Sequence, residues 1–403
     1  MKRVRLISAL LPVCLLLCSC APPALRTLPA PSTGAEDSRP PETVQTPGQD
    51  AENARREAEE QNTLWLAERI LRDMSVEEKV GQMFIIRCPE SGAEEVVDRY
   101  EPGGYILFAN RFDGRTKRQV ADDVREWQDE SDIPMLIGVD EEGGTVNRVS
   151  RYTAFRAVPF WSPQELYSEG GFELVRSDTE EKAKLLKSLG INLNFAPVCD
   201  VPSDSGDFIY RRSFGTDAQQ TAEYVKIVVE EMNRRKIGCV LKHFPGYGDN
   251  GDTHTDVVHD MRPYETFVSR DFLPFQAGID AGAGCVLVAH NIVACMDGDY
   301  PASLSPAVHQ ILREELGFGG VIITDDLAME GVKKYADNAS VAVQAVAAGN
   351  DMLTCTDYEE QIPAVIRAVQ NGEIAESRLD ESVLRILKWK IRLGIIDRRD
   401  LDD

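Results

Sequence analysis

Basic residues are scarce in this sequence of 403 residues. Its 44 lysines and arginines stand against 67 aspartates and glutamates, which gives a formal net charge of −23. Proteins that bind nucleic acids need a basic face to contact phosphates, so this balance argues against a nucleic acid partner. It also disfavours direct electrostatic adhesion to an anionic membrane. An acidic surface of this kind is typical of a soluble protein.

Closely spaced cysteines are missing too. Beyond the first twenty residues six cysteines remain, each isolated in the chain and with no Cys-x-x-Cys pair: Cys88, Cys199, Cys239, Cys285, Cys295 and Cys355. Most lie in or beside apolar runs, where a free cysteine behaves as a small hydrophobic residue, so we predict no disulfide. The fixed ligand spacings of zinc sites are also absent. We expect neither a metal nor an organic cofactor.

The amino terminus lacks an apolar run long enough to span a bilayer as an ordinary helix. The run Leu6–Leu17 follows a positively charged start, as in an export signal, but is too short to cross. The next residues, Leu17-Cys18-Ser19-Cys20, resemble a bacterial lipobox. We predict that residues 1–20 are a lipoprotein signal peptide and that a lipid on the thiol of Cys20 tethers the protein. An uncleaved anchor and a plain secretory signal are the alternatives.

Large apolar residues are also rare from Ala21 to about Asp50, where Pro, Thr, Ser and Glu predominate. Such a segment cannot bury enough surface to offset the entropy of the chain, so we predict a disordered linker over residues 21–55. The linker would hold one catalytic domain, residues 56–403, outside the cytoplasm and close to the cell membrane.

Within this domain, eight short aliphatic runs alternate with polar, amphipathic segments. The runs are Gln82–Arg87, Gly104–Ala109, Met135–Val139, Leu193–Val198, Cys239–Phe244, Cys285–Ala289, Val321–Thr324 and Asp351–Thr354. Such runs are typical of strands buried on both faces of a parallel sheet. The segments between them, such as Arg118–Gln128 and Gln219–Arg235, have the pattern of helices. The sequence therefore predicts an α/β fold, a (β/α)8 TIM barrel, with a doubly wound sheet as the alternative.

Charged residues follow several of the predicted strands, at the ends where barrels form their active sites. Asp140-Glu141-Glu142 follows the third strand, Lys242-His243 ends the fifth and Asp325-Asp326 follows the seventh. A glycine-rich loop after the fifth strand brings four titratable residues within eight positions, namely Asp252, His254, Asp256 and His259. Titratable groups on a glycine-rich loop that follows a buried strand indicate an enzyme.

Three motifs carry a resemblance to a known family. KHFPGYG from Lys242, with DTH from Asp252, resembles the signature of glycoside hydrolase family 3 in its bacterial β-N-acetylglucosaminidase branch. VDEEGG from Val139 and VIITDDLAM from Val321 agree with it. The match extends from about Leu64 to about Ile395.

This resemblance implies a retaining exo-β-N-acetylglucosaminidase that releases terminal N-acetylglucosamine from peptidoglycan-derived fragments. A retaining glycosidase needs a carboxylate nucleophile and a group that serves first as acid and then as base. Asp325 matches the nucleophile of the family, and His254, with Asp252 as its partner, matches the acid and base. An imidazole suits this role because it titrates near neutrality. The terminal sugar would be bound by Asp140, Arg212, Lys242 and His243.

The chain departs from the family pattern at two positions. Tyr247 stands where the family usually has a second histidine, and Thr145 follows the Glu-Gly-Gly motif where the family usually has arginine. These changes put the aglycone preference in doubt more than the reaction.

Several other functions stay open as alternatives. A β-glucosidase or a glycoside phosphorylase of the same fold fits the motifs, as does a lipid-anchored protein that binds sugars without cleaving them. A metal-dependent hydrolase would use His254 and His259 as ligands. The range Gly246–Gly251 fits a dinucleotide-binding pattern, but its aspartates would repel a pyrophosphate. We expect a monomer whose partner is a carbohydrate.

Overall fold

The computed structural model describes residues 47–251, 257–329, 332, 334–335 and 341–397, with side chains from Glu52 onward. The chain divides into two compact units, Met1–Asn53 and Ala54–Asp403. In the first unit the described part is the beginning of helix α1 (Pro47–Asp73), which starts within the range predicted to be a linker. Residues 51–60 are rich in Ala, Glu and Arg, whose high helix propensity favours this start.

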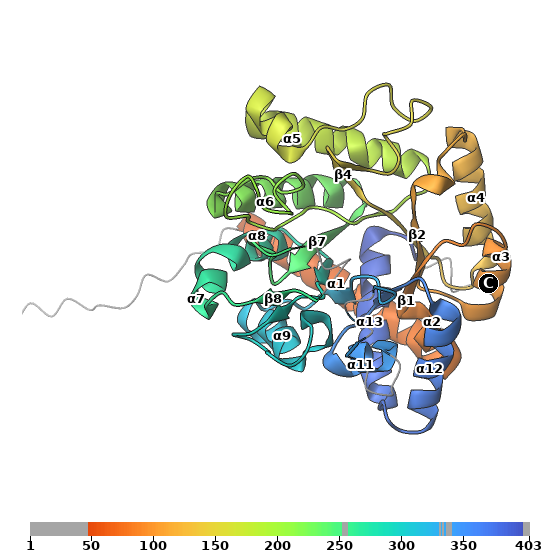
Figure 1. Ribbon diagram of the computed structural model, residues 1–403. Coiled ribbons are helices and arrows are strands. Elements are labelled where there is room, and N and C mark those ends of the chain that lie inside the picture. Colours follow the sequence, from red (N-terminus) through yellow and green to blue (C-terminus); the bar gives the residue numbers. More distant parts are fainter. Residues whose placement is uncertain (1–46, 252–256, 330–331, 333, 336–340, 398–403) are drawn as a thin grey trace, which may run out of the picture. The chain divides into compact units, whose positions relative to one another are not determined.

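Eight parallel strands form the centre of the second unit (Figure 1). Their order in the sheet is β11 (Val321–Thr324), β9 (Cys285–Val288), β7 (Gly238–Phe244), β6 (Leu193–Asn194), β3 (Leu136–Val139), β2 (Gly104–Leu107), β1 (Phe84–Arg87) and β12 (Leu353–Cys355). The sheet closes because the backbone N–H groups of Asp351 and Met352 donate to the carbonyl of Ile322, at 2.8 and 3.0 Å. The eight strands coincide with the eight predicted runs, and the predicted barrel is confirmed.

Helices alternate with these strands and surround them (Figure 1). The longer ones are α2 (Val76–Gln82), α3 (Ala93–Tyr100), α4 (Lys117–Glu130), α5 (Pro163–Ser188), α6 (Ala218–Arg234), α8 (Phe272–Asp280), α11 (Val341–Ala348), α12 (Tyr358–Gln370) and α13 (Glu376–Leu393). Shorter helical segments are Ala109–Arg111, α7 (Tyr264–Thr266), Phe267–Asp271, Ala302–Leu304, α9 (Pro306–Gln310) and Ile311–Glu315. Two short ladders, β4 (Glu141–Gly143) with β5 (Val146–Asn147) and β8 (His259–Asp260) with β10 (Ile292–Val293), lie outside the barrel sheet.

Side chains fill the interior of the barrel, and one of them, Phe195, has room only because a glycine lies opposite it. Phe195, which is 2% exposed, packs against Gly138 of β3. A Cβ atom at position 138 would lie 2.7 Å from the ring of Phe195, closer than side chains approach. A glycine in this strand therefore lets the aromatic ring fill the barrel.

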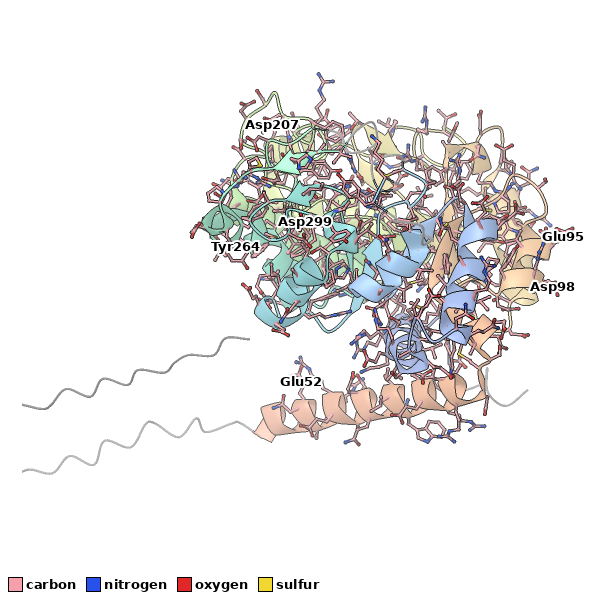
Figure 2. All side chains as sticks on the ribbon, turned by 60° about the horizontal axis from the view of Figure 1, so that its bottom comes forward. Glu52, Glu95, Asp98, Asp207, Tyr264 and Asp299 are labelled. Atoms are coloured by element: carbon pink, nitrogen blue, oxygen red, sulfur yellow. The ribbon has the colours of Figure 1, made fainter. Side chains whose placement is uncertain are left out.

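The surface of the second unit carries many acidic side chains, and Glu95, Asp98 and Asp299 point outward from it (Figure 2). The six cysteines are free, five of them buried and Cys295 exposed. In the described ranges, no helix combines the length and the apolar composition that crossing a membrane requires.

Candidate active site

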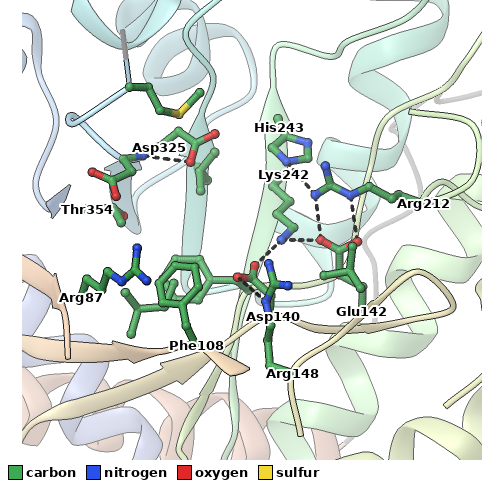
Figure 3. Close-up of a pocket in the computed structure, with 16 residues that line it drawn as sticks. Arg87, Phe108, Asp140, Glu142, Arg148, Arg212, Lys242, His243, Asp325 and Thr354 are labelled. Atoms are coloured by element: carbon green, nitrogen blue, oxygen red, sulfur yellow. Dashed lines mark hydrogen bonds and ion pairs between the residues drawn. The ribbon is translucent and has the colours of Figure 1, made fainter. Parts of the chain in front are cut away.

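A cavity of about 340 Å³ opens at the carboxyl ends of the barrel strands (Figure 3). Its volume is at the lower end of the range for small-molecule pockets and fits a single sugar ring. The lining residues come from the eight barrel strands or from the segments after them. They are Arg87, Ile106, Phe108, Asp140, Glu142, Val146, Arg148, Phe195, Arg212, Lys242, His243, Leu287, Asp325, Asp326, Met329 and Thr354.

A chain of opposite charges crosses one side of this cavity (Figure 3). The Nζ of Lys242 lies 2.8 Å from Oδ1 of Asp140 and 2.7 Å from Oε1 of Glu142. Arg212 donates to the same Glu142 from Nε to Oε2, at 3.0 Å, and from Nη2 to Oε1, at 2.8 Å. Two carboxylates and two cations therefore hold one another in fixed positions before any ligand binds.

Burial and pairing act in opposite directions on these charges. Burial alone would raise the pKa of Glu142, but the adjacent Lys242 and Arg212 outweigh it and hold that pKa well below its usual range. Burial likewise disfavours the charged form of Lys242, yet Asp140 and Glu142 raise its pKa above the ordinary value. Glu142 is therefore an ionised carboxylate at neutral pH and cannot act as a proton donor there.

Asp200 fixes the orientation of His243. Its Oδ2 lies 2.7 Å from Nδ1 of the histidine ring, and its Oδ1 accepts from the backbone N–H of Tyr247, at 2.7 Å. A carboxylate partner requires a proton on Nδ1, and Nε2 lies 3.2 Å from Nη2 of Arg212, which can only donate. These partners select the neutral tautomer of His243 with its proton on Nδ1.

Asp325 and Asp326 have different surroundings although they are adjacent in the chain. Asp326 braces the turn: its Oδ1 accepts from the N–H of Ala328 at 2.9 Å and its Oδ2 from the hydroxyl of Thr356 at 2.5 Å. The Oδ1 of Asp325 accepts from the N–H of Asp326, at 2.9 Å. Because Asp325 directly follows β11, a rigid strand end carries it at the cavity.

Two arginines and a phenylalanine form another part of the wall (Figure 3). The guanidinium carbon of Arg87 lies 4.6 Å from the ring centre of Phe108, and that of Arg148 lies 5.6 Å from it. Arg148 also approaches Asp140, with 3.9 Å between Nε and Oδ2. The cavity thus joins an apolar surface to several hydrogen-bonding groups, as sugar recognition requires.

The structure brings most of the predicted site residues together. Asp140, Arg212, Lys242, His243 and Asp325 all line this one cavity. Asp252, His254 and Cys20 lie outside the described residues.

Glu142 and Asp200 belong to the site but are not among the residues predicted for it, although the sequence carries a signal for each. Glu142 lies in β4, two positions after Asp140, which directly precedes that strand. Side chains two positions apart in extended chain face the same way, and both of these line the cavity. Glu141 between them instead accepts from the backbone N–H groups of Arg148, Val149 and Ser150. Asp200 follows the end of the fourth predicted strand, like the other charged strand ends.

No group of three or more potential metal ligands is close enough to hold an ion within the part of the chain that the structure describes. The groups that converge on the cavity are carboxylates, cations and an imidazole.

Comparison with known proteins decides the family. The model of the glycosyl hydrolase family 3 N-terminal domain matches residues 75–389. The chain belongs to glycosyl hydrolase family 3. It is a glycoside hydrolase related to β-hexosaminidases.

Two curated relatives illustrate this membership of family 3. The chain is 36% identical over 231 residues to a β-hexosaminidase of Xanthomonas campestris, an alignment that covers 56% of this chain and 68% of the relative. It is 30% identical over 336 residues to the β-hexosaminidase LpqI of Mycobacterium tuberculosis, covering 79% of this chain and 83% of the relative.

Solved structures of family 3 agree with the barrel. A β-N-acetylglucosaminidase of this family from Paenibacillus sp. FPU-7 superposes with a TM-score of 0.74 at 31% identity, covering 80% of this chain. This chain spans 63% of the length of that protein. A family member from Mycobacterium smegmatis superposes with a TM-score of 0.71 at 28% identity, covering 79% of this chain and 98% of the other.

Proposed function

We propose that this glycoside hydrolase is a retaining exo-β-N-acetylglucosaminidase that releases terminal N-acetylglucosamine from peptidoglycan-derived fragments. The observation that carries the proposal is the meeting of Asp325 with the charged group of Asp140, Arg212, Lys242 and His243 in one cavity of about 340 Å³. A cavity of this size holds one terminal sugar, which is what an exo-acting enzyme binds. The names of the β-hexosaminidase relatives and of the Paenibacillus β-N-acetylglucosaminidase support the choice of an N-acetylated sugar.

In the first step, an oxygen of the Asp325 carboxylate attacks the anomeric carbon, and the bond from that carbon to the aglycone oxygen breaks. His254 donates a proton to the departing oxygen, so the aglycone leaves as a neutral alcohol. The sugar is then bound to Asp325 as an ester. Asp140, Lys242 and Arg212 bind the hydroxyls of the sugar and orient its anomeric carbon toward the carboxylate.

In the second step, neutral His254 accepts a proton from water, whose oxygen attacks the same carbon and releases the Asp325 carboxylate. Two displacements at one carbon retain the configuration. Two carboxyl groups of the cavity are poorly suited to donate this proton, since Glu142 is ionised and Asp326 braces a turn. This supports an acid that comes from another part of the chain. His254, with Asp252 as its partner, would supply that acid.

The test compares 4-nitrophenyl N-acetyl-β-glucosaminide with the matching β-glucoside on the full-length chain, alongside Asp325→Asn. We expect strong preference for the N-acetylated sugar and loss of at least about 10³-fold in kcat for the variant, because the covalent step lacks its nucleophile. Equal turnover of both sugars would favour a β-glucosidase. Acceleration by phosphate with release of a sugar phosphate would favour a phosphorylase, and sugar binding without turnover a binding protein.

We also propose that residues 1–20 are a lipoprotein signal peptide and that Cys20 carries the lipid, with a linker from Ala21 up to α1 and the catalytic domain beyond it. The lipobox-like residues Leu17-Cys18-Ser19-Cys20 support this proposal. The enzyme would then act outside the cytoplasm, held to the cell membrane by acyl chains. Cys20→Ala should release the protein into the soluble fraction, and mass spectrometry of the wild-type amino-terminal peptide should find a lipid on Cys20.

A further inference from the structure

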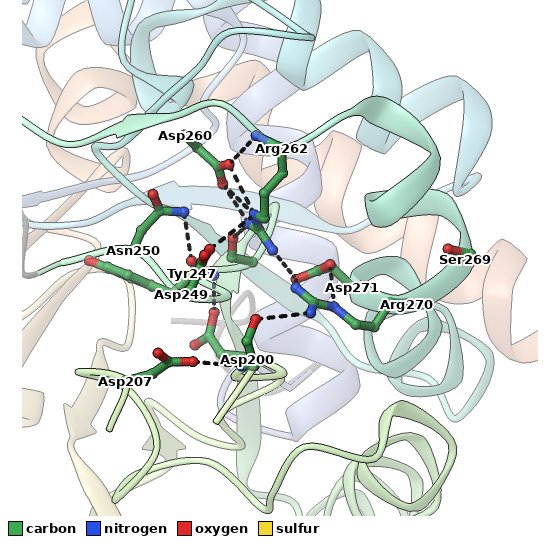
Figure 4. A network of polar contacts seen from close by, with 12 residues as sticks. Asp200, Asp207, Tyr247, Asp249, Asn250, Asp260, Arg262, Ser269, Arg270 and Asp271 are labelled. Atoms are coloured by element: carbon green, nitrogen blue, oxygen red, sulfur yellow. Dashed lines mark hydrogen bonds and ion pairs between the residues drawn. The ribbon is translucent and has the colours of Figure 1, made fainter. Parts of the chain in front are cut away.

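Arg262 joins three parts of the chain beside the candidate active site (Figure 4). It lies two residues after β8, and 12% of its side chain is exposed. Its Nε donates to Oδ1 of Asp260 at 2.9 Å, and its Nη1 donates to Oδ1 of Asp271 at 2.9 Å. Its Nη2 donates to the backbone carbonyl of Gly246, at 2.7 Å. One guanidinium thus connects the end of β8, the residue before α8 and the turn after β7.

The backbone after β7 passes so close to this guanidinium that side chains are excluded there. A Cβ atom at Gly248, where φ is +57°, would lie 2.1 Å from Nη1 of Arg262. A Cβ atom at Gly246 would lie 2.8 Å from Oδ1 of Asp271. Both glycines are therefore required by the close approach of the chain to the Arg262 cluster.

The cluster joins one cation to two buried carboxylates. Asp260 and Asp271 are 0% and 1% exposed, so each needs a cation close by. Burial disfavours the charged form of Arg262, but the two carboxylates outweigh it and raise its pKa above the ordinary value. The ring of Phe267 lies beneath the guanidinium, 4.4 Å from ring centre to guanidinium carbon. Arg262 therefore stays charged at neutral pH. At Asp271 burial outweighs the adjacent Arg262 and Arg270 and raises the pKa of the carboxyl above its ordinary value.

Arg262 links the two segments that precede and follow residues 252–256 in the sequence. The later segment is fixed by β10: Val258 accepts from the N–H of Ile292 and Asp260 from that of Ala294, both at 2.9 Å. The earlier segment begins at Gly246, immediately after Phe244-Pro245 at the end of β7. Residues 252–256, which contain Asp252 and His254, lie between them in the sequence.

We propose that Arg262 is a positioning residue for the proton-transfer steps: by binding Gly246 and Asp260 at once, it fixes the two ends of the loop that carries the acid. This inference rests on the role proposed above for His254. Arg270 offers a matched control, because it donates to the same Asp271, from Nε to Oδ2 at 3.1 Å and from Nη2 to Oδ1 at 3.4 Å. Its Nη1 donates to Ser203, and among the described residues it forms no hydrogen bond with Gly246 or Asp260. A purely structural role for the buried charges would affect stability, whereas positioning of the acid affects chemistry that needs a proton.

The experiment uses Arg262→Gln, Arg270→Gln and His254→Ala in the full-length chain. The substrates are N-acetyl-β-glucosaminides of 2,4-dinitrophenol, which leaves without protonation, and of phenol, which needs it. For His254→Ala, kcat/KM with the phenyl substrate should fall by about 10²-fold more than with the dinitrophenyl substrate. Arg262→Gln should show the same selectivity, by about tenfold, and Arg270→Gln should show none.

Azide provides a second readout that a structural role would not change. As an anionic nucleophile it attacks the anomeric carbon of the glycosyl ester without a base, releases the Asp325 carboxylate and forms a β-glycosyl azide. We expect azide to accelerate dinitrophenyl turnover by Arg262→Gln and His254→Ala, but not by Arg270→Gln or the wild type. If Arg262→Gln does not fold, Gly248→Ala displaces the guanidinium from the opposite side and should give the same selectivity and azide response.

The outcomes separate the two proposals. If His254→Ala shows the selectivity and Arg262→Gln, or Gly248→Ala in its place, loses activity equally on both substrates, the inference is overturned and the proposed acid stands. If Arg270→Gln matches Arg262→Gln, the effect comes from Asp271 and the inference is again overturned. If His254→Ala itself shows no selectivity, the proposed acid is wrong and the inference fails with it.

Discussion

The ammonium group of Lys242 and the carboxylate of Glu142 lie 2.7 Å apart, and their side chains are only 3% and 2% exposed. Two charges so far from water are stable because each has further partners, Asp140 for the lysine and Arg212 for the glutamate. Glu142 therefore supports Lys242 and Arg212, the two cations that we propose bind the sugar. Asp140, at the edge of this cluster with 16% of its side chain exposed, is the carboxylate best placed to accept from sugar hydroxyls.

Replacement of Glu142 tests this division of roles. Glu142→Gln leaves Lys242 and Arg212 with less negative charge in a buried site, so we expect the free energy of unfolding to fall by about 3 kcal/mol. KM for the N-acetylglucosaminide should rise, because the two cations lose their fixed positions. Urea denaturation and steady-state kinetics measure both effects.

Glu141→Gln is the matched control, since among the described residues this equally buried carboxylate accepts from the backbone N–H groups of Arg148, Val149 and Ser150, just after β5. It should lower stability while KM changes little. An unchanged KM for Glu142→Gln would contradict the assigned role.

Asp200→Asn tests the tautomer of His243. The Oδ2 of Asp200 accepts from Nδ1–H and the backbone N–H of His243, and its Oδ1 accepts from the N–H of Tyr247. An amide has one oxygen and can accept at only one of these two positions. We expect kcat/KM to fall by roughly 10²-fold, because the ring and Arg212 lose their alignment. Nitrogen NMR of the imidazole would report the change of tautomer. Asp207→Asn is the control, because among the described residues Asp207 accepts from backbone N–H groups of its own loop, those of Ser203 and Asp204.

Lys390 on α13 gives a prediction about stability and pH. It is fully buried, donates to Oε1 of Gln82 at 2.7 Å, and burial lowers its pKa to about 7. In the unfolded chain the pKa of this lysine is about 10.4. Between a pH of about 7 and a pH of about 10.4 the unfolded state therefore holds more protons than the folded state. The contribution of Lys390 to the free energy of unfolding thus rises with pH over this range.

Comparison of Lys390→Met with the wild type isolates this contribution. The variant should gain more stability at pH 7.5 than at pH 9.5, by about 2 kcal/mol. Urea denaturation at the two pH values measures the difference. An equal effect at both would mean that Lys390 is charged in the folded protein.

The barrel could be predicted from the sequence because each of its strands is a local signal. All eight aliphatic runs became strands, and a capping box of Ser75 and Glu78 begins α2. Helices α3 and α8 were not predicted: α3 has eight residues, and α8 contains Pro274 in its first turn, where its missing N–H is tolerated. Segments this short or this irregular depend on packing more than on sequence pattern.

Site residues that belong to a sequence motif could be predicted, whereas contacts between residues far apart in the sequence could not. Asp325 and Lys242 belong to strand-end motifs, whereas the pairing of Glu142 with Arg212 joins residues 70 positions apart. The same holds for Asp200 and His243, 43 positions apart, and for Arg262 with Gly246. Such contacts arise only when the strands close into a barrel.

The central claim is that Asp325 is the nucleophile, and trapping the glycosyl ester tests it most directly. An N-acetyl-β-glucosaminyl fluoride with fluorine also at C5 reacts quickly, because fluoride leaves easily, but its ester hydrolyses slowly, because the second fluorine destabilises the positively charged transition state. Mass spectrometry of the digested protein should find the sugar on Asp325, and on no residue in Asp325→Asn. A sugar attached to Asp326, or release of the opposite anomer with no adduct, would contradict the account.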